Sequence, residues 1–106
     1  MNLYYTGTEG HAKAFVREMT ESGTVSAIRQ LPGCLRYDYF YSAADDETVL
    51  LIDTWENQKA LDDYHASDLM GKVARLREKY DLHMKAERYV SEDMRNEDMA
   101  FIRSMK

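Results

Sequence analysis

Apolar and aromatic positions recur along the chain with two different periods, and the change from one period to the other predicts strands and helices. Short runs rich in tyrosine, valine and isoleucine are typical of strands, whereas apolar residues three or four apart are typical of helices. By these patterns, strands are expected at residues 3–6, 34–42, 47–55 and 82–90, and helices around residues 12–19, 25–31, 57–66 and 67–80.

Turn-forming and capping residues divide these elements. A Leu-Pro-Gly sequence at residues 31–33 is expected to end the second helical stretch, because proline disfavours α geometry in the residue before it. Residues 43–46 form a polar turn between two strands that are close enough to make a hairpin. Side-chain oxygens at the start of a helix accept backbone N–H groups. The predicted N-caps are Thr8, Thr24, Asn57 and Ser67.

The order of these elements, β-α-β-β-α-β, is the split βαβ pattern of a ferredoxin-like α+β domain, which we assign to residues 1–91. Residues 92–106 are expected to form a C-terminal helical tail, because acidic residues come early in it and basic residues come late. The tail is also rich in apolar side chains, so we expect it to dock on a surface, with the partner subunit favoured over a frayed end. These side chains are Met94, Met99, Phe101, Ile102 and Met105.

Composition narrows the choice of function and partners. A chain of 106 residues suits a single domain, and its net charge of −5 argues against a nucleic-acid-binding surface. The single cysteine, Cys34, cannot form an internal disulfide, which is consistent with a reducing, cytoplasmic environment. No apolar run approaches the ~20 residues that a membrane span needs, so no membrane partner is expected.

Motifs for bound groups are absent from the sequence. The three histidines, at positions 11, 65 and 83, are far apart, and no zinc-type spacing, phosphate-binding glycine loop or dinucleotide fingerprint occurs. The sequence therefore predicts a protein that works without a metal or a cofactor.

The expected strand at residues 47–55 carries an unusual face. Alternation puts Leu51, Asp53 and Trp55 on one side, and it puts Leu50, Ile52 and Thr54 on the other, where they are expected to pack on the helices. A carboxylate beside an indole is unusual in a core. Either that face lines a polar pocket, or Asp53 is a charge at the rim that pairs with a base.

Aromatic residues elsewhere offer further candidates. Tyr37 and Tyr5, with other tyrosines of the expected strands, suit a ligand pocket or a dimer interface, because each has an apolar ring and a polar tip. Tyr64 and His65 follow Trp55 on the next expected helix, and a histidine there could exchange protons near neutral pH. For His65 alone, a surface position is the simpler interpretation.

Three pieces of sequence together resemble a known family. These pieces are Pro32-Gly33-Cys34-Leu35-Arg36-Tyr37-Asp38, then Asp53-Thr54-Trp55-Glu56-Asn57, then Ala60-Leu61 followed by a histidine. They are similar to the antibiotic-biosynthesis monooxygenase-like family, over about residues 1–90. The resemblance implies a homodimeric α+β barrel and covers cofactor-free quinol and anthrone oxygenases, haem-degrading enzymes and an isomerase.

The sequence also departs from the family pattern. Where many members carry a helix histidine, nine residues after Trp55, this chain has Tyr64, and His65 lies one residue later. A second family histidine is replaced by Leu69, and the iron-ligating histidine of the haem-degrading branch is replaced by Ala74. Iron ligation needs a histidine, so the substitution argues against haem degradation.

The resemblance and the residue chemistry together favour a cofactor-independent monooxygenase that oxidises a small quinol-like aromatic with O₂. In this interpretation His65 or Tyr64 handles the proton, Arg36 steadies an anionic oxygen, and Trp55, Tyr37 and Tyr5 form the aromatic wall. Two alternatives stay open at this point. They are an isomerase of a small metabolite that uses the same pocket, and a small-ligand-binding or stress-response protein without catalysis.

Overall fold

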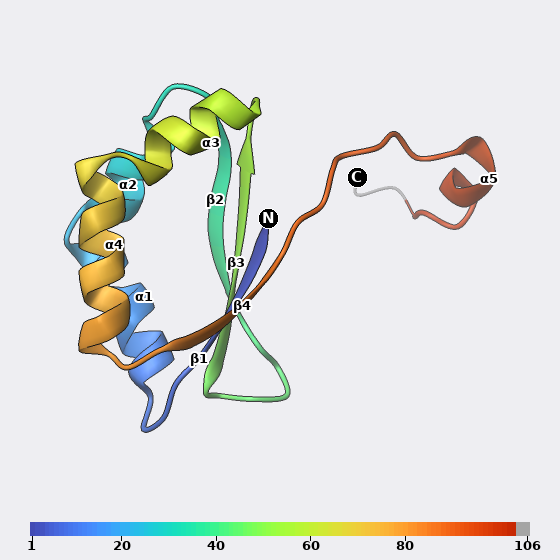
Figure 1. The fold of residues 1–106 in the computed structure, drawn as a ribbon. Coiled ribbons are helices and arrows are strands. Elements are labelled where there is room, and N and C mark those ends of the chain that lie inside the picture. The colour runs from blue at the N-terminus through green and yellow to red at the C-terminus, as the bar shows by residue number, and fades with distance from the viewer. Residues whose placement is uncertain (104–106) are drawn as a thin grey trace.

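The chain folds into one antiparallel sheet covered by helices, as the computed structural model shows for residues 1–103 (Figure 1). The strands are β1 (Asn2–Thr6), β2 (Cys34–Tyr41), β3 (Thr48–Trp55) and β4 (His83–Glu87). The helices are α1 (His11–Glu21), α2 (Thr24–Arg29), α3 (Gln58–His65), α4 (Asp68–Lys79) and α5 (Asn96–Met99). None of these helices is long and apolar enough to cross a membrane.

The sheet has the strand order β2-β3-β1-β4, and every neighbouring pair is antiparallel. The predicted β-α-β-β-α-β order is confirmed, with the first connection divided into α1 and α2 and the second into α3 and α4. The two central strands are β1 and β3, so the chain is an α+β domain of the ferredoxin-like kind.

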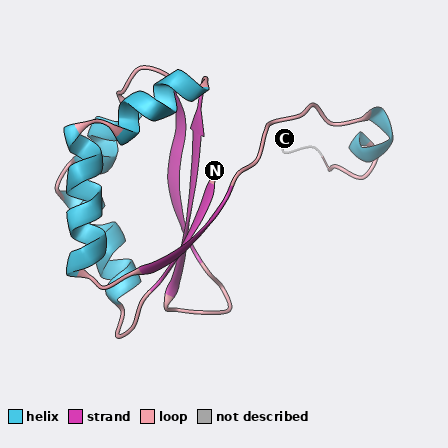
Figure 2. Ribbon diagram, in the orientation of Figure 1, coloured by secondary structure: helices cyan, strands magenta, loops and turns pink. Residues whose placement is uncertain are grey.

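Helices α1 to α4 lie on one face of the sheet, and they leave its other face without a helical cover (Figure 2). The core lies between the two layers. Phe15 and Met19 of α1, Ile28 of α2 and Val73 of α4 are fully buried there against Leu51 and other side chains of the sheet. This buried layer supplies most of the free energy that holds the two layers together.

The faces of β3 are the reverse of our prediction. Leu51 and Asp53 lie under the helices, each 1% exposed, whereas Leu50 and Ile52 are only partly buried on the open face. The prediction assumed that a carboxylate would avoid the core. In the structure the Trp55 indole and the Met1 amino group lie beside Asp53, so that its charge is accommodated inside.

Two of the four predicted helix caps are correct. The Asn57 side chain accepts a hydrogen bond from the backbone N–H of Ala60, and Ser67 accepts one from that of Met70. The predictions of Thr8 and Thr24 are wrong, because α1 and α2 begin instead after Gly10 and Gly23, whose φ angles are 79° and 80°. Glycine adopts this left-handed conformation without a steric penalty, so the chain reverses direction there without a side-chain cap.

The chain leaves the sheet after β4, and Figure 1 shows residues 88–103 projecting away from the two layers. The tail is helical only at Asn96–Met99, a shorter stretch than the one predicted over residues 92–106, of which residues 104–106 lie outside the described part. A helix without a packing partner is marginal at such lengths. Several apolar side chains of this segment are exposed, including Val90 and Phe101, each at 88%.

Candidate functional site

A cavity of about 510 Å³ opens at one end of the sheet. Its walls come from the start of β1, the end of β3, the first turn of α3 and residues 88–91. The register explains the opening. Strand β1 begins at Asn2, which pairs with Ile52 of β3 on one side and with Glu87 of β4 on the other. Met1 continues this central chain and hydrogen-bonds to the main chain of Asp53, and the cavity lies beside Met1 and Asn2.

Asp53 lies at the wall of this cavity and is 1% exposed. Its Oδ2 accepts a hydrogen bond of 3.1 Å from Nε1 of Trp55. Its Oδ1 is buried and accepts no hydrogen bond from any residue between 1 and 103, although the Met1 amino nitrogen lies 3.5 Å away. Buried polar atoms are rarely left unpaired, and here the Met1 ammonium forms an ion pair with Oδ1, whose capacity to accept a hydrogen bond is unused within residues 1–103.

Trp55 joins the cavity to a cluster of buried tyrosines. Its ring stacks on Tyr64 with 4.9 Å between centroids and 16° between planes. Tyr64 meets Tyr37 edge-on at 6.3 Å, and the hydroxyls of Tyr37 and Tyr39 are 3.4 Å apart. Aromatic rings with few rotatable bonds hold one another in place, so the cluster fixes the orientation of the Trp55 indole.

The tyrosines of this cluster keep their protons well above neutral pH. Burial raises the pKa of Tyr37, Tyr39 and Tyr64 above the ordinary value. Burial also raises the pKa of Tyr5 to about 12, although the positive charge of Arg77 opposes the shift. These hydroxyls are therefore hydrogen-bond donors rather than bases at neutral pH.

Arg77 is a site residue that the sequence prediction missed. Its Nη2 donates a 2.6 Å hydrogen bond to the Tyr5 hydroxyl, and its guanidinium lies 5.2 Å from the centre of that ring. Its Nε is buried and has no partner among the described residues. A signal was present in the sequence, since Arg77 follows the buried Val73 by four positions and therefore shares its helical face.

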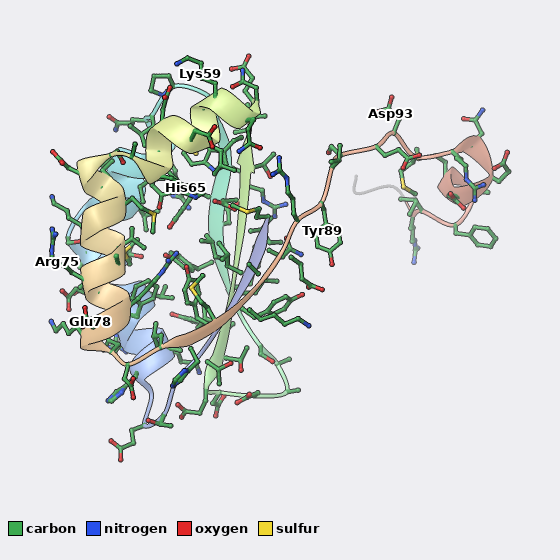
Figure 3. The ribbon with its side chains drawn as sticks, in the orientation of Figure 1. Lys59, His65, Arg75, Glu78, Tyr89 and Asp93 are labelled. Atoms are coloured by element: carbon green, nitrogen blue, oxygen red, sulfur yellow. The ribbon has the colours of Figure 1, made fainter. Side chains whose placement is uncertain are left out.

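Two predicted site residues lie elsewhere. Arg36 is on the open face of the sheet, where it forms an ion pair of 3.0 Å with Asp38 and stacks 5.5 Å from the Phe40 ring centre. His65 is exposed at the end of α3 (Figure 3), with its ring 5.7 Å from that of Tyr64. Of the predicted site residues, Asp53 and Trp55 line the cavity. Tyr64 and Tyr37 pack behind Trp55, Tyr5 lies beside Arg77, and Arg36 and His65 are exposed.

Arg88 is the second residue that the prediction missed. It lines the cavity on the segment after β4, next to Tyr89, which Figure 3 labels. Its Nη2 donates a 2.5 Å hydrogen bond to Oε1 of Gln58, in the first turn of α3. No pattern in the sequence marks Arg88, because its role depends on how the end of β4 meets α3. Within residues 1–103, no three acidic, histidine or cysteine side chains cluster as a metal site.

Solved structures share this fold at low sequence identity. A conserved protein of unknown function from Bacteroides thetaiotaomicron matches with a TM-score of 0.69 and 18% identity, over 79% of this chain and 86% of its own. A Deinococcus radiodurans protein, provisionally assigned as an antibiotic biosynthesis monooxygenase, matches with a TM-score of 0.66 and 16% identity, over 91% and 100%. SnoaB from Streptomyces nogalater, a cofactor-independent oxygenase crystallised as a point mutant, gives a TM-score of 0.63 and 15% identity, over 84% and 91%.

Sequence comparison leads to the same family. No curated protein matches the chain. The family model described as antibiotic biosynthesis monooxygenase matches residues 1–76, which hold every strand but the last and most of the helical layer. The resemblance expected from the sequence pieces around Gly33 and Trp55 is therefore confirmed, and the chain belongs to the antibiotic biosynthesis monooxygenase family.

Proposed function

We propose that this protein is a cofactor-independent monooxygenase that oxidises a small quinol-like aromatic with O₂. The observation that carries the proposal is the buried carboxylate of Asp53 at the wall of a cavity that Trp55 also lines; its Oδ1 accepts no hydrogen bond from residues 1–103 and is paired only by charge with the Met1 amino group. Membership of the family and the similarity in fold to SnoaB support the reaction class.

The chemistry begins with loss of a proton. A quinol hydroxyl at the cavity wall donates a hydrogen bond to Oδ1 of Asp53 and then transfers its proton there. The resulting anion is rich in electrons and reduces O₂ directly. One oxygen atom enters the ring and the other leaves as water, so a quinol and O₂ give a hydroxyquinone and H₂O. The substrate supplies all four electrons, and no external reductant takes part.

The side chains around Asp53 position the reactants in this proposal. The Trp55 indole offers a flat apolar face to the ring, and its N–H holds Asp53 through Oδ2. Tyr64 stacks behind Trp55 and is a positioning residue, since it does not line the cavity. Proton handling by the Tyr64 hydroxyl or by His65, as the sequence suggested, is the competing proposal.

Oxygen uptake tests the reaction directly. Purified protein is mixed with a panel of quinols in buffer containing a chelator and no flavin, and O₂ consumption is measured together with the product. We expect one O₂ per quinol and one oxygen atom from labelled O₂ in the hydroxyquinone. Substrate conversion without O₂ consumption would indicate an isomerase. Binding without conversion of any quinol would indicate a binding protein, and either result refutes the proposal.

We also propose that the protein works as a homodimer through the open face of its sheet. Leu50 lies at the centre of that face, paired across the sheet with Tyr4 on β1 and with Phe40 on β2. Phe40 is 40% exposed, and no helix of residues 1–103 packs on this side (Figure 2). Apolar patches of this kind usually mark an interface.

Sedimentation at micromolar concentration tests the dimer. We expect a species of twice 12.4 kDa, and we expect the variant Leu50→Glu to sediment as a monomer with unchanged helix content by circular dichroism. A wild-type protein that stays at 12.4 kDa at all concentrations would refute the dimer.

A further inference from the structure

We infer that Arg88 makes the cavity selective for an aromatic substrate that carries an acidic group, such as a carboxylate, beside its hydroxyls. This inference deepens the proposed function and rests on it only for the identity of the ring. It arises from three features of the cavity: an arginine without an acidic partner among residues 1–103, a carboxylate on the strand at the other side, and apolar side chains that also line the space.

The first feature is the state of the Arg88 guanidinium. Its hydrogen bond goes to the neutral amide of Gln58, and no carboxylate of the described residues lies within ion-pair distance. Arg95, seven positions further along the same segment, instead pairs with Glu97 and Asp98. A guanidinium binds a carboxylate through two parallel N–H donors, and Gln58 engages only one of the terminal nitrogens of Arg88.

The second feature is the position of Arg88 relative to Asp53. Strands β3 and β4 flank β1, and Arg88 directly follows β4, so Asp53 on β3 and Arg88 line the cavity from opposite sides of β1. Beyond Asn2 the central position holds Met1, whose main chain hydrogen-bonds to that of Asp53, and the cavity opens beyond Met1. A flat aromatic ring can occupy the place that a central strand would fill. Its hydroxyl then faces Asp53 and its acidic group faces Arg88.

The third feature is the apolar surface that also lines the space. Trp55 and Leu61 line one part of the cavity, and Tyr89 lines another. An aliphatic acid would leave much of this surface in contact with water, whereas an aromatic ring covers it. The cavity thus combines a ring-sized apolar space, an acceptor for hydroxyl protons and a cation for an acid.

Ligand binding without turnover tests this inference. Trp55 is the single tryptophan of the chain, so its fluorescence reports on the cavity wall directly. Under anaerobic conditions, gentisate, which is hydroquinone with one carboxylate, is titrated against methylhydroquinone, a neutral ring of similar size. We expect gentisate to bind about tenfold more tightly, because a charge-assisted hydrogen bond is stronger than a neutral one. Added salt should reduce this difference.

Two variants test whether Arg88 causes the preference for gentisate. Arg88→Gln should remove the preference for gentisate, so that gentisate and methylhydroquinone bind with similar affinity. The matched control Arg95→Gln changes an arginine on the same segment that does not line the cavity, and it should keep the preference. Equal affinity of the wild-type protein for the two ligands, a preference that survives Arg88→Gln, or no fluorescence change with either ligand would overturn the inference.

The outcomes separate this inference from the proposed function. Binding of gentisate that depends on Arg88, without O₂ uptake, would refute the monooxygenase and support the acid-binding role of Arg88. Oxidation of neutral quinols with no preference for gentisate would support the monooxygenase and refute the acid-binding role of Arg88.

Discussion

Replacing Asp53 by asparagine separates the proposed chemistry from the fold. The substitution removes the charge and the ability to take up a proton, and it keeps nearly the same shape. The asparagine oxygen can accept the hydrogen bond that Nε1 of Trp55 now donates to Oδ2 of Asp53 at 3.1 Å. Asp53→Ala would be less informative, because it would remove the acceptor of the Trp55 indole N–H.

The expected loss of activity is large compared with the expected change in stability. General-base assistance contributes about 10²–10⁴-fold to rate, or roughly 3–5 kcal/mol of the barrier. The free energy of unfolding should fall by about 1–3 kcal/mol, because the hydrogen bond to Trp55 persists but the ion pair with the Met1 amino group is lost. The Met1 amino group also keeps its 2.5 Å hydrogen bond to the main-chain oxygen of residue 53.

The assay combines initial rates of O₂ uptake with denaturant unfolding of the same preparations. Asp63→Asn is the matched control, because Asp63 is exposed and pairs only with Lys59 on the surface of α3. We expect the control to match the wild-type protein in both measurements. Ligand affinity by Trp55 fluorescence confirms that each variant still has an intact cavity.

Retention of activity within about tenfold in a folded Asp53→Asn protein would refute a base role for Asp53. The competing proton-handling residues would then become the first candidates. An Asp53→Asn protein that binds its ligand and turns over at least about a hundredfold more slowly is the result that the proposal requires.

Three further predictions follow from the same structure. Tyr64→Phe keeps the stack on Trp55, and His65→Ala changes an exposed side chain, so each variant should retain turnover within about threefold. A loss of turnover near 10²-fold in either variant would assign proton transfer to that residue. Because folding raises the pKa of Tyr5 from 10.0 to about 12, its contribution to stability is complete below pH 10.0 and is lost as the pH rises toward 12; urea unfolding across that range should show a steady decrease. Deleting residues 92–106 removes the exposed Phe101 and Ile102 and should weaken the dimer or ligand binding, and unchanged dissociation, melting and affinity would show that the tail is an appendage.

The elements could be predicted from the sequence because each is determined by local chemistry. Tyrosine-rich and β-branched runs gave strands close to Cys34–Tyr41 and Thr48–Trp55. The last strand ends at Glu87 rather than near residue 90, because its partner β1 begins at Asn2, opposite Glu87, and offers no backbone groups beyond that point. Strand ends are decided by the neighbouring strand, which local patterns do not reveal.

The candidate site could be predicted only in part. Asp53 and Trp55 were chosen because a carboxylate beside an indole is unusual in a strand, and the structure puts both at the cavity. The prediction for the two faces of β3 was wrong because the groups that stabilise a buried charge come from distant residues. For Asp53 these groups include the amino group of Met1, which lies 52 positions away in the sequence.

Residues contributed by other elements were the hardest to foresee. Arg77 is a cation on the buried face of α4, and its meaning depends on Tyr5, which is 72 positions away. Arg88 and Gln58 meet only because the end of β4 passes the start of α3. The residues that flank these side chains in the sequence form no recognisable motif. Their contacts can therefore be identified only when the sheet register is known.

Alternation along β3 connects the cavity with the open face of the sheet. Leu50 and Ile52 point to the open side, Leu51 and Asp53 point toward the helices, and Ile52 also lines the cavity. A strand is a single layer of backbone, so a subunit packed on Leu50 and Ile52 would rest against the same segment that carries the carboxylate. Beyond Asn2 this end of β3 lacks its central neighbour and is held on that side only through Met1. Contact from a second subunit would therefore restrict the part of β3 on which the geometry of Asp53 and Trp55 depends.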